Sequence, residues 1–295
     1  MKASIVTPSY NSIDMLRHTL LSLEKQDIGM ENFEVIVIDD GSTDGTSEYL
    51  NNYNGKLNLH PVINAKNLGR AKSRNKGISA AKNELIIFLD ADIEAKPDFV
   101  RHHLAQHAKS ECACVGKVLF HPELVQNSYM KYLDERGSAK MKPGEMLPGK
   151  YFRTTNASVP ASILMKAGCF DENFIHYGGE DSEIGMRIAD EVPIFYLPEA
   201  IGYNRHSRSL EQSLDIIRVY GEHSLPYLLK KRPELKKDIL REGKFYSPLL
   251  PLACSKPFFR LFKALAAKGF VPSFIYSYLL LCSYRSGYKK SKRVR

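Results

Sequence analysis

The first third of the chain alternates short apolar runs with segments of helical spacing, and this alternation limits the possible folds more than any other feature. The strongest runs are residues 3–7 (ASIVT), 33–38 (FEVIVI) and 84–89 (ELIIFL), and the helical segments are residues 14–26 and 67–81. Weaker strands are expected at residues 57–63, 113–119 and 193–197. Strands separated by helices pair in parallel and are covered on both faces. The sequence therefore predicts an α/β fold with a doubly wound, mostly parallel sheet, whose ligands bind beyond the carboxyl ends of the strands.

Helical spacing dominates from residue 210 onward, and the chain divides there in composition as well. The length of 295 residues suits one large or two small domains. We expect an α/β domain over residues 1–210 and a helical, basic region over residues 211–295.

The positive charge is concentrated in that second region. The chain has 42 Lys and Arg against 33 Asp and Glu, and ten of the basic residues lie in residues 256–295, where no acidic residue occurs. They flank an apolar segment, residues 269–284, which is shorter than the roughly 20 residues that span a bilayer. Amphipathic helices rich in Lys and Arg lie in the interface of anionic membranes, so we expect this tail to bind the inner face of the cell membrane peripherally. The alternative is that the helices pack on the rest of the protein and the basic residues are simply solvated.

Three further features bear on the partners and the compartment. The basic residues are not spread over a folded face with stacking aromatic side chains, so nucleic acid is not an expected partner. The first apolar run breaks at Pro8 and is too short for a secretory signal. The five cysteines are odd in number and lack paired CxxC spacing, which favours reduced thiols over a disulfide framework or a zinc site. Together these features predict a cytoplasmic protein.

A first group of polar residues follows the first two strong strands. Tyr10 and Asn11 come after one, and Asp39, Asp40 and Ser42 come after the other. A carboxylate can accept from the imide of a base and a tyrosine ring can stack on it, so the pattern suits a nucleoside. Ordinary turn chemistry explains the same residues. The glycines do not fit the GxGxxG spacing of a dinucleotide site.

A second group, Asp90-Ala91-Asp92, follows the apolar strand at residues 84–89. Two carboxylates at a strand end can hold a hard divalent cation, which can neutralise a departing diphosphate. The alternative is a solvated turn in which Asp92 caps the next helix.

A third group lies in the sequence His176-Tyr177-Gly178-Gly179-Glu180-Asp181. Acidic residues at a helix start can be simple caps, but the glycine pair would let another molecule approach the backbone. Asp181 is the candidate general base for deprotonating a sugar hydroxyl. His206 is a candidate metal ligand, with ordinary packing as its alternative.

Taken together, these residues resemble the inverting glycosyltransferases of family 2, which have the GT-A fold. IVTPSYN, VIDDGSTDGT, NLGRAKSRNKGI and FLDAD resemble the donor half of that family. CFDENFIHYGGEDSEIGMRI resembles the acceptor half, as seen in bacterial polysaccharide-synthesising members. The resemblance covers about residues 3–210.

The resemblance implies a role for each matching residue. On the donor side it places Pro8, Tyr10 and Asp40 against uridine with Asp39 nearby, Asn67, Arg70 and Arg74 along the nucleotide or its diphosphate, Asp90 at the ribose or metal, and Asn156 at a hydroxyl or N-acetyl group of the sugar. It implies Asp92 and His206 as metal ligands, Asp181 as the catalytic base and Glu180 as its acceptor-binding neighbour.

The resulting hypothesis is a transferase that depends on Mn²⁺ or Mg²⁺ and moves a hexose or N-acetylhexosamine from a UDP-sugar to a saccharide. We expect this saccharide to be lipid-linked and the reaction to belong to cell-surface polysaccharide biosynthesis. Two alternatives stay open. A sugar nucleotidyltransferase would show an early Gly-rich, basic phosphate loop, which residues 8–14 (PSYNSID) lack. A non-catalytic, membrane-recruited saccharide-binding protein would keep the fold without turnover.

Overall fold

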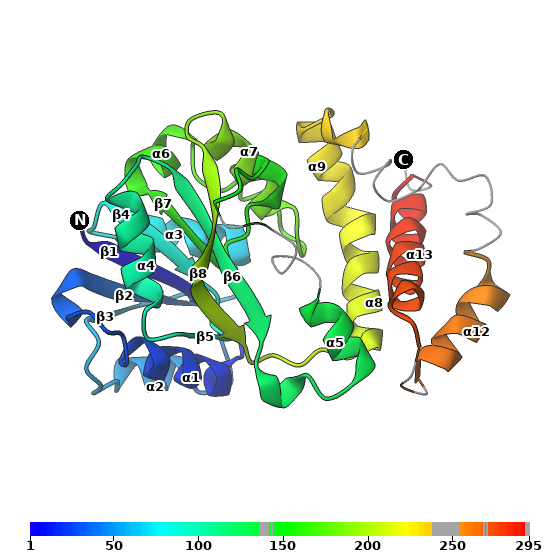
Figure 1. The fold of residues 1–295 in the computed structure, drawn as a ribbon, viewed down its shortest axis with the longest axis horizontal. Coiled ribbons are helices and arrows are strands. Elements are labelled where there is room, and N and C mark those ends of the chain that lie inside the picture. Colours follow the sequence, from blue (N-terminus) through cyan, green and yellow to red (C-terminus); the bar gives the residue numbers. More distant parts are fainter. Residues whose placement is uncertain (136–141, 143, 238–253, 268, 270, 293–295) are drawn as a thin grey trace. The chain divides into compact units, whose positions relative to one another are not determined.

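The computed structural model describes the whole chain except residues 136–141, 143, 238–253, 268, 270 and 293–295. Two compact units make up the chain (Figure 1). The first unit contains residues 1–121, 137–175 and 180–206, and the second contains residues 122–136, 176–179 and 207–295. The second unit therefore includes two segments that precede residue 207 as well as the helical region expected from the sequence.

An eight-stranded sheet forms the centre of the first unit, with the order β3-β2-β1-β4-β7-β6-β8-β5. Its strands are β1 (Ala3–Ser9), β2 (Phe33–Asp39), β3 (Leu59–Ile63), β4 (Leu85–Leu89), β5 (Ile93–Ala95), β6 (Ala113–Phe120), β7 (Asn156–Pro160) and β8 (Ile194–Asn204). Strands β1 to β4 pair in parallel, as do β6 and β8. β7 runs antiparallel to β4 and β6, and β5 runs antiparallel to β8. The predicted α/β class is confirmed, and the sheet is mixed in its second half.

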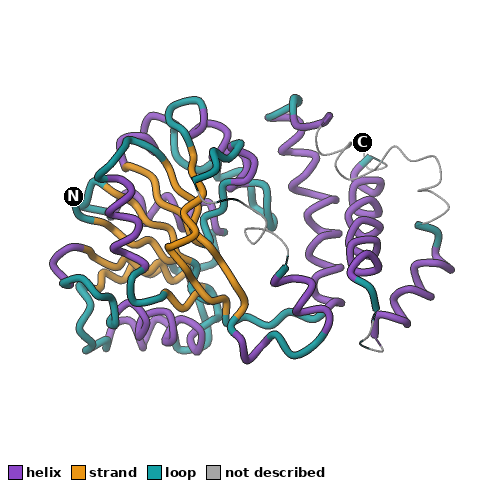
Figure 2. The backbone as a smooth tube through the Cα atoms, viewed as in Figure 1, coloured by secondary structure: helices purple, strands orange, loops and turns teal. Residues whose placement is uncertain are grey.

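Helices cover both faces of this sheet, as Figure 2 shows. They are α1 (Ile13–Leu23), α2 (Thr46–Asn51), α3 (Arg70–Ala80), α4 (Phe99–His107), α6 (Ala161–Lys166) and α7 (Glu180–Ala189), with short 3-10 turns at Met30–Asn32 and Gly149–Tyr151. Side chains of α1, α2 and α4 share one apolar core with the sheet, and those of α3, α6 and α7 share the other. Because both faces are covered, β2 is buried along its entire length, which explains the apolar run at residues 35–38.

The second unit is helical. It contains a 3-10 turn (Pro122–Leu124), α5 (Ser128–Asp134), α8 (Leu210–Val219), a π-helical turn η5 (Tyr220–Ser224), α9 (Leu225–Lys231), α12 (Lys256–Ala267) and α13 (Ser273–Ser291). Tyr276 and Leu279 of α13 are fully buried against α5 and α8. The apolar segment at residues 269–284 therefore supplies much of this unit's core. Among the residues described, no helix combines the length and the hydropathy needed to cross a membrane.

The cysteines correct one expectation from the sequence. Cys254 and Cys282 form a disulfide that joins the residues before α12 to α13, whereas Cys112, Cys114 and Cys169 are free thiols. The two bonded cysteines are 28 residues apart, so no short sequence pattern indicates that they pair. The expectation of reduced thiols is therefore wrong for Cys254 and Cys282, and it holds for the other three cysteines.

Candidate active site

The candidate residues follow the ends of three neighbouring parallel strands. β1 pairs with β2 so that Ser9 lies opposite Asp39, and β4 lies on the other side of β1. The chain after each of these strands therefore leaves the sheet at the same edge. Tyr10, Asp40 and Asp90 are all found there, which is the edge where the sequence predicts ligand binding.

Asp40 holds the loop before α3 in place at this edge by hydrogen bonds. Its buried carboxylate accepts hydrogen bonds from the backbone N–H groups of Leu68 (2.8 Å) and Gly69 (2.9 Å) and from Asn64 Nδ2 (2.9 Å). Carboxylates bonded in this way are held in one position. Asp40 thus fixes the loop that leads into α3, and its predicted contact with uridine stays a prediction.

Asp39 and Tyr10 lie at the same edge of the sheet but differ in burial. Asp39 is buried, accepts from the N–H of Ser42 (3.0 Å) and from the Ser47 hydroxyl, and so shapes the turn after β2. Tyr10 is 50% exposed, which leaves its ring open to a stacking partner. Pro8 lies one residue before the end of β1, opposite Ile38. Of these residues, only Tyr10 presents a largely exposed side chain.

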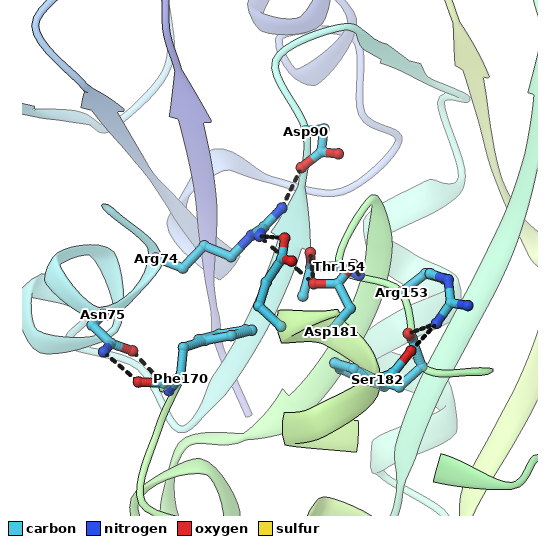
Figure 3. A network of polar contacts seen from close by, with 10 residues as sticks. Arg74, Asn75, Asp90, Arg153, Thr154, Phe170, Asp181 and Ser182 are labelled. Atoms are coloured by element: carbon cyan, nitrogen blue, oxygen red, sulfur yellow. Dashed lines mark hydrogen bonds and ion pairs between the residues drawn. The ribbon is translucent and has the colours of Figure 1, made fainter. Parts of the chain in front are cut away.

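Arg74 of α3 is the centre of a buried ion-pair cluster (Figure 3). Its guanidinium lies 3.1 Å from Asp90, 3.2 Å from Glu180 and 3.6 Å from Asp181, and its side chain is 3% exposed. The three acids hold its pKa above the ordinary value despite burial. The structure therefore encloses Arg74 among carboxylates, whereas the resemblance placed it along the nucleotide. The exposed residues Asn67 and Arg70 lie just before it in the chain.

This cluster joins two motifs that are 90 residues apart in the chain. Asp90 belongs to the turn after β4, and Glu180 and Asp181 begin α7. The sequence predicts that these acids converge on one site, and the shared contact with Arg74 brings them together.

The two acids at the start of α7 differ in environment. Asp181 accepts from Thr154 Oγ1 (2.8 Å) and from the Thr154 N–H (3.3 Å), and its side chain is 17% exposed. Glu180 is buried, and its Oε2 has no hydrogen-bond partner among the residues described. Burial raises the pKa of Glu180, and the neighbouring charge of Asp181 adds to the rise. Asp181 is therefore the more accessible of the two acids, and it has a fixed orientation.

Asp92 lies two residues beyond Asp90 and carries a perturbed carboxyl group. Burial raises its pKa to about 6, and the charge of Asp90 adds to the rise. Asn204 Nδ2 donates to Asp92 Oδ2 (3.3 Å), which favours the ionised form. A carboxylate held beside another carboxylate is stabilised by any cation that binds both.

Asn204 also connects Asp92 to His206. The N–H of His206 donates to Asn204 Oδ1 (2.7 Å), so one amide side chain touches both expected metal ligands. Within the described part of the chain, Asp90, Asp92 and His206 do not form a group in which all ligand atoms lie within 4.8 Å of one another. The donor set of carboxylate oxygens and an imidazole nevertheless fits Mn²⁺ or Mg²⁺ in its chemistry.

Asn156 lies inside the sheet, and its predicted contact with the donor sugar stays a prediction. It is buried in β7, its Nδ2 donates to the carbonyls of Lys117 and Ala200, and its Oδ1 lies 3.0 Å from His103 Nε2. These contacts use its amide inside the sheet.

The glycine pair before Glu180 also has another explanation than the one expected. Gly178 and Gly179 both have positive φ, 83° and 98°, which side chains other than glycine rarely adopt. A Cβ on Gly178 would lie 2.9 Å from Tyr220 of the same unit. The pair therefore makes a tight turn packed on a tyrosine, which accounts for both glycines without a ligand.

Two polar residues of this site were missed by the sequence reasoning. Thr154 orients Asp181, and Asn204 touches Asp92. Neither lies in an acidic motif. Thr154 comes two residues before β7 and contacts the first turn of α7, and the pairing of β8 with β5 sets Asn204 opposite Ile93, the residue after Asp92.

Comparison with known proteins gives a consistent result. The family model described as "Glycosyl transferase family 2" matches residues 4–170. Validoxylamine A glucosyltransferase of Streptomyces hygroscopicus subsp. jinggangensis is 31% identical over 267 residues, which cover 80% of this chain and 62% of that protein. Chondroitin synthase of Escherichia coli is 25% identical over 297 residues, which cover 86% of this chain and 43% of that protein. The chain thus spans about three fifths or less of the length of these two relatives.

A solved structure supports the fold. The mannosyltransferase PcManGT from Pyrobaculum calidifontis, in complex with GDP-mannose and Mn²⁺, aligns with a TM-score of 0.66 at 18% identity. The alignment covers 98% of this chain and 88% of that one. At this identity the likeness concerns the arrangement of the elements, which is that of a GT-A glycosyltransferase.

Proposed function

Because the chain belongs to glycosyl transferase family 2, we propose that it transfers a sugar from a UDP-sugar to a hydroxyl group of a saccharide, with inversion at the anomeric carbon. The observation that carries this proposal is the cluster around Arg74. It links the turn after β4, at the nucleotide edge of the sheet, to the first turn of α7, which carries the proposed base. A single site then contains groups for both the donor and the acceptor.

Asp181 is the proposed base. A direct displacement needs one carboxylate that accepts the proton of the attacking hydroxyl while the bond to UDP breaks. Asp181 suits this role because it is partly exposed and because Thr154 and Arg74 fix its carboxylate. Glu180 is buried beside it and is proposed to shape the acceptor side. Inversion follows from a single displacement, since no covalent intermediate forms on the protein.

The leaving diphosphate needs neutralising charge. Asp92 is proposed to hold Mn²⁺ or Mg²⁺ together with Asp90 or His206, and the raised pKa of Asp92 supports this because a cation would relieve the repulsion between the two carboxylates. When bound, such an ion supplies charge stabilisation to the departing UDP. Arg70 lies near enough to lower the pKa values of Asp92 and Glu180, so it adds positive charge at the same place.

The second unit offers a surface for a membrane-bound acceptor. Phe258, Leu261 and Leu265 lie three and four residues apart on α12 and are 46%, 53% and 38% exposed. The same helix carries Lys256 and Arg260. An exposed apolar stripe with basic residues beside it is typical of helices that lie in an anionic interface. We place the enzyme at the inner face of the membrane, where it extends a lipid-linked saccharide of a polysaccharide pathway.

A donor panel tests the catalytic proposal. The full chain is incubated with UDP-glucose, UDP-galactose, their N-acetylamino analogues and GDP-mannose, each with Mn²⁺ or with EDTA, and the released nucleoside diphosphate is measured. We expect UDP from at least one UDP-sugar, loss of release with EDTA and recovery with excess Mn²⁺. Release of GDP alone would refute the UDP assignment. Binding of UDP-sugars without any release would indicate a binding protein, and pyrophosphate formed from UTP and a sugar phosphate would indicate a nucleotidyltransferase.

A vesicle assay tests the membrane proposal. We expect the full chain to sediment with vesicles that contain phosphatidylglycerol and to remain free of pure phosphatidylcholine vesicles, because Lys and Arg add affinity for anionic lipid. Replacing Phe258, Leu261 and Leu265 with Ser should weaken this binding at least about tenfold, since each buried apolar side chain contributes about 1.5–3 kcal/mol. Met165→Ser with Ile175→Ser is the matched control, because those side chains are 65% and 70% exposed in the first unit. Equal loss in both variants would refute the assignment to α12.

A further inference from the structure

A buried group of metal-binding side chains lies in the first unit and has no part in the proposed reaction. It consists of His107, the last residue of α4, with Cys112 directly before β6 and Cys114 as the second residue of β6. One ligand atom from each of the three lies within 4.8 Å of the other two, and all three residues are buried. Side chains two residues apart on a strand point to the same face, so both thiols reach the core beneath α4.

The spacing of the two sulfurs matches a known coordination geometry. Cys112 Sγ and Cys114 Sγ are 3.8 Å apart. Two thiolates bound to tetrahedral Zn²⁺ at about 2.3 Å are also about 3.8 Å from each other. The pair is thus already at the separation that zinc requires.

His107 has one free ring nitrogen and one that is already oriented. Its Nε2 lies 2.8 Å from Ser158 Oγ, whereas its Nδ1 is buried without a hydrogen-bond partner among the residues described. An unpartnered buried nitrogen is costly, and a metal-bound histidine typically uses one nitrogen for the metal and the other for such a fixing contact.

The surrounding contacts resemble the outer shell of a metal site. Ser158 Oγ also lies 2.8 Å from His103 Nδ1, and His103 Nε2 lies 3.0 Å from Asn156 Oδ1. A buried chain of polar groups therefore runs from Asn156 to His107. This chain gives Asn156 a structural role inside the sheet.

We infer that His107, Cys112 and Cys114 form a binding site for Zn²⁺, separate from the carboxylates of the candidate active site. Thiolate and imidazole ligands select zinc, whereas the oxygen ligands Asp90 and Asp92 suit Mn²⁺ or Mg²⁺. Binding displaces the thiol protons to solvent and joins the end of α4 to β6. Gln106 and Ser110, which hydrogen-bond Cys112, also line a cavity of about 500 Å³ in the same unit.

Cobalt substitution tests this site. The full chain is purified anaerobically without reductant, so that the disulfide between Cys254 and Cys282 stays closed, and its thiols are counted after denaturation. Three are expected. Co²⁺ is then added, and the absorption band of sulfur-to-cobalt charge transfer is recorded. We expect one equivalent of Co²⁺ to produce the band, and Zn²⁺ to remove it and to raise the melting temperature.

Matched variants separate this site from other thiols and from the active site. Cys114→Ser should lose the band and the response to Zn²⁺, whereas Cys169→Ser and Asp92→Asn should keep both. Circular dichroism checks that Cys114→Ser is folded, and Cys112→Ser serves as a second test if it is not. The inference is overturned if the wild-type protein with three free thiols gives no band, if Cys114→Ser keeps the band, or if only one thiol is found because Cys112 and Cys114 are bonded to each other.

Discussion

Replacing Arg74 with Met should destabilise the protein strongly and in a pH-dependent way. The substitution removes a cation that contacts Asp90, Glu180 and Asp181 together. Removing one member of a buried ion pair typically costs about 3–5 kcal/mol. Asp90 and Asp181 are partly exposed, at 28% and 17%, so water compensates them in part. We therefore expect a loss of about 3 kcal/mol near pH 8, at the lower end of that range.

The pH dependence follows from Glu180. Its pKa in the folded protein is already raised above 4.5 by burial and by Asp181, and the charge of Arg74 opposes that rise. Without Arg74 the pKa rises further, so the native state holds the proton at a pH where the unfolded chain has lost it. The free energy of unfolding must then fall as the pH increases from 4.5 through the folded pKa. The defect of the variant should accordingly be smaller at pH 5 than at pH 8.

Urea denaturation followed by far-UV circular dichroism measures both effects, and it suits a chain without tryptophan. Adding Glu180→Gln to the Arg74→Met variant removes the orphaned charge and should recover at least about 1 kcal/mol at pH 8. Lys72→Met is the control on the same helix, because its contact with Glu172 is exposed and 3.9 Å long, and it should change stability by less than about 0.5 kcal/mol. A loss for Arg74→Met as small as this, or one that does not change with pH, would refute the reasoning.

Three further outcomes are expected. Gly77→Ala should destabilise by about 1–3 kcal/mol in urea denaturation, because the new Cβ would lie 2.4 Å from Val6 Cγ1; wild-type stability would contradict this close packing. Without divalent cations, the free energy of unfolding of the wild type should fall between pH 3.8 and about 6, because the Asp92 carboxyl keeps its proton in the native state at a pH where the unfolded chain has lost it. Asp92→Asn should flatten this fall; parallel pH curves for the two proteins would contradict the prediction. Thr154→Val should lower kcat with little change in UDP affinity, since Thr154 Oγ1 orients Asp181; an unchanged kcat would exclude that role.

Much of the sheet was predictable because the sequence of each central strand itself has the pattern of a buried strand. β4 is an unbroken apolar run, β1 and β2 each contain a shorter one, and turn residues follow all three strands. β7 has the sequence NASVP, which has no such run, and it exists because β4 and β6 pair with it on both sides. A strand that is defined by its neighbours cannot be recognised from its own residues.

The candidate site was predictable in part for the same reason. Asp90 of FLDAD stands out by its position after a strand, and Glu180 and Asp181 by theirs at the start of a helix; all three contact Arg74. The enclosed position of Arg74 and the inward-facing amide of Asn156 depend on contacts with residues far away in the chain. The disulfide of Cys254 with Cys282 and the approach of His107 to Cys114 depend on tertiary packing in the same way.

The most direct test of the account compares sugar transfer and UDP binding in the wild type and in Asp181→Asn. Asn keeps the size of the side chain and its place beside Thr154 but cannot accept the proton of the attacking hydroxyl. The account predicts that kcat falls about 10²–10⁴-fold while the Kd for UDP and the melting temperature are unchanged. Transfer at the wild-type rate, or a loss of UDP binding equal to the loss of transfer, would contradict it.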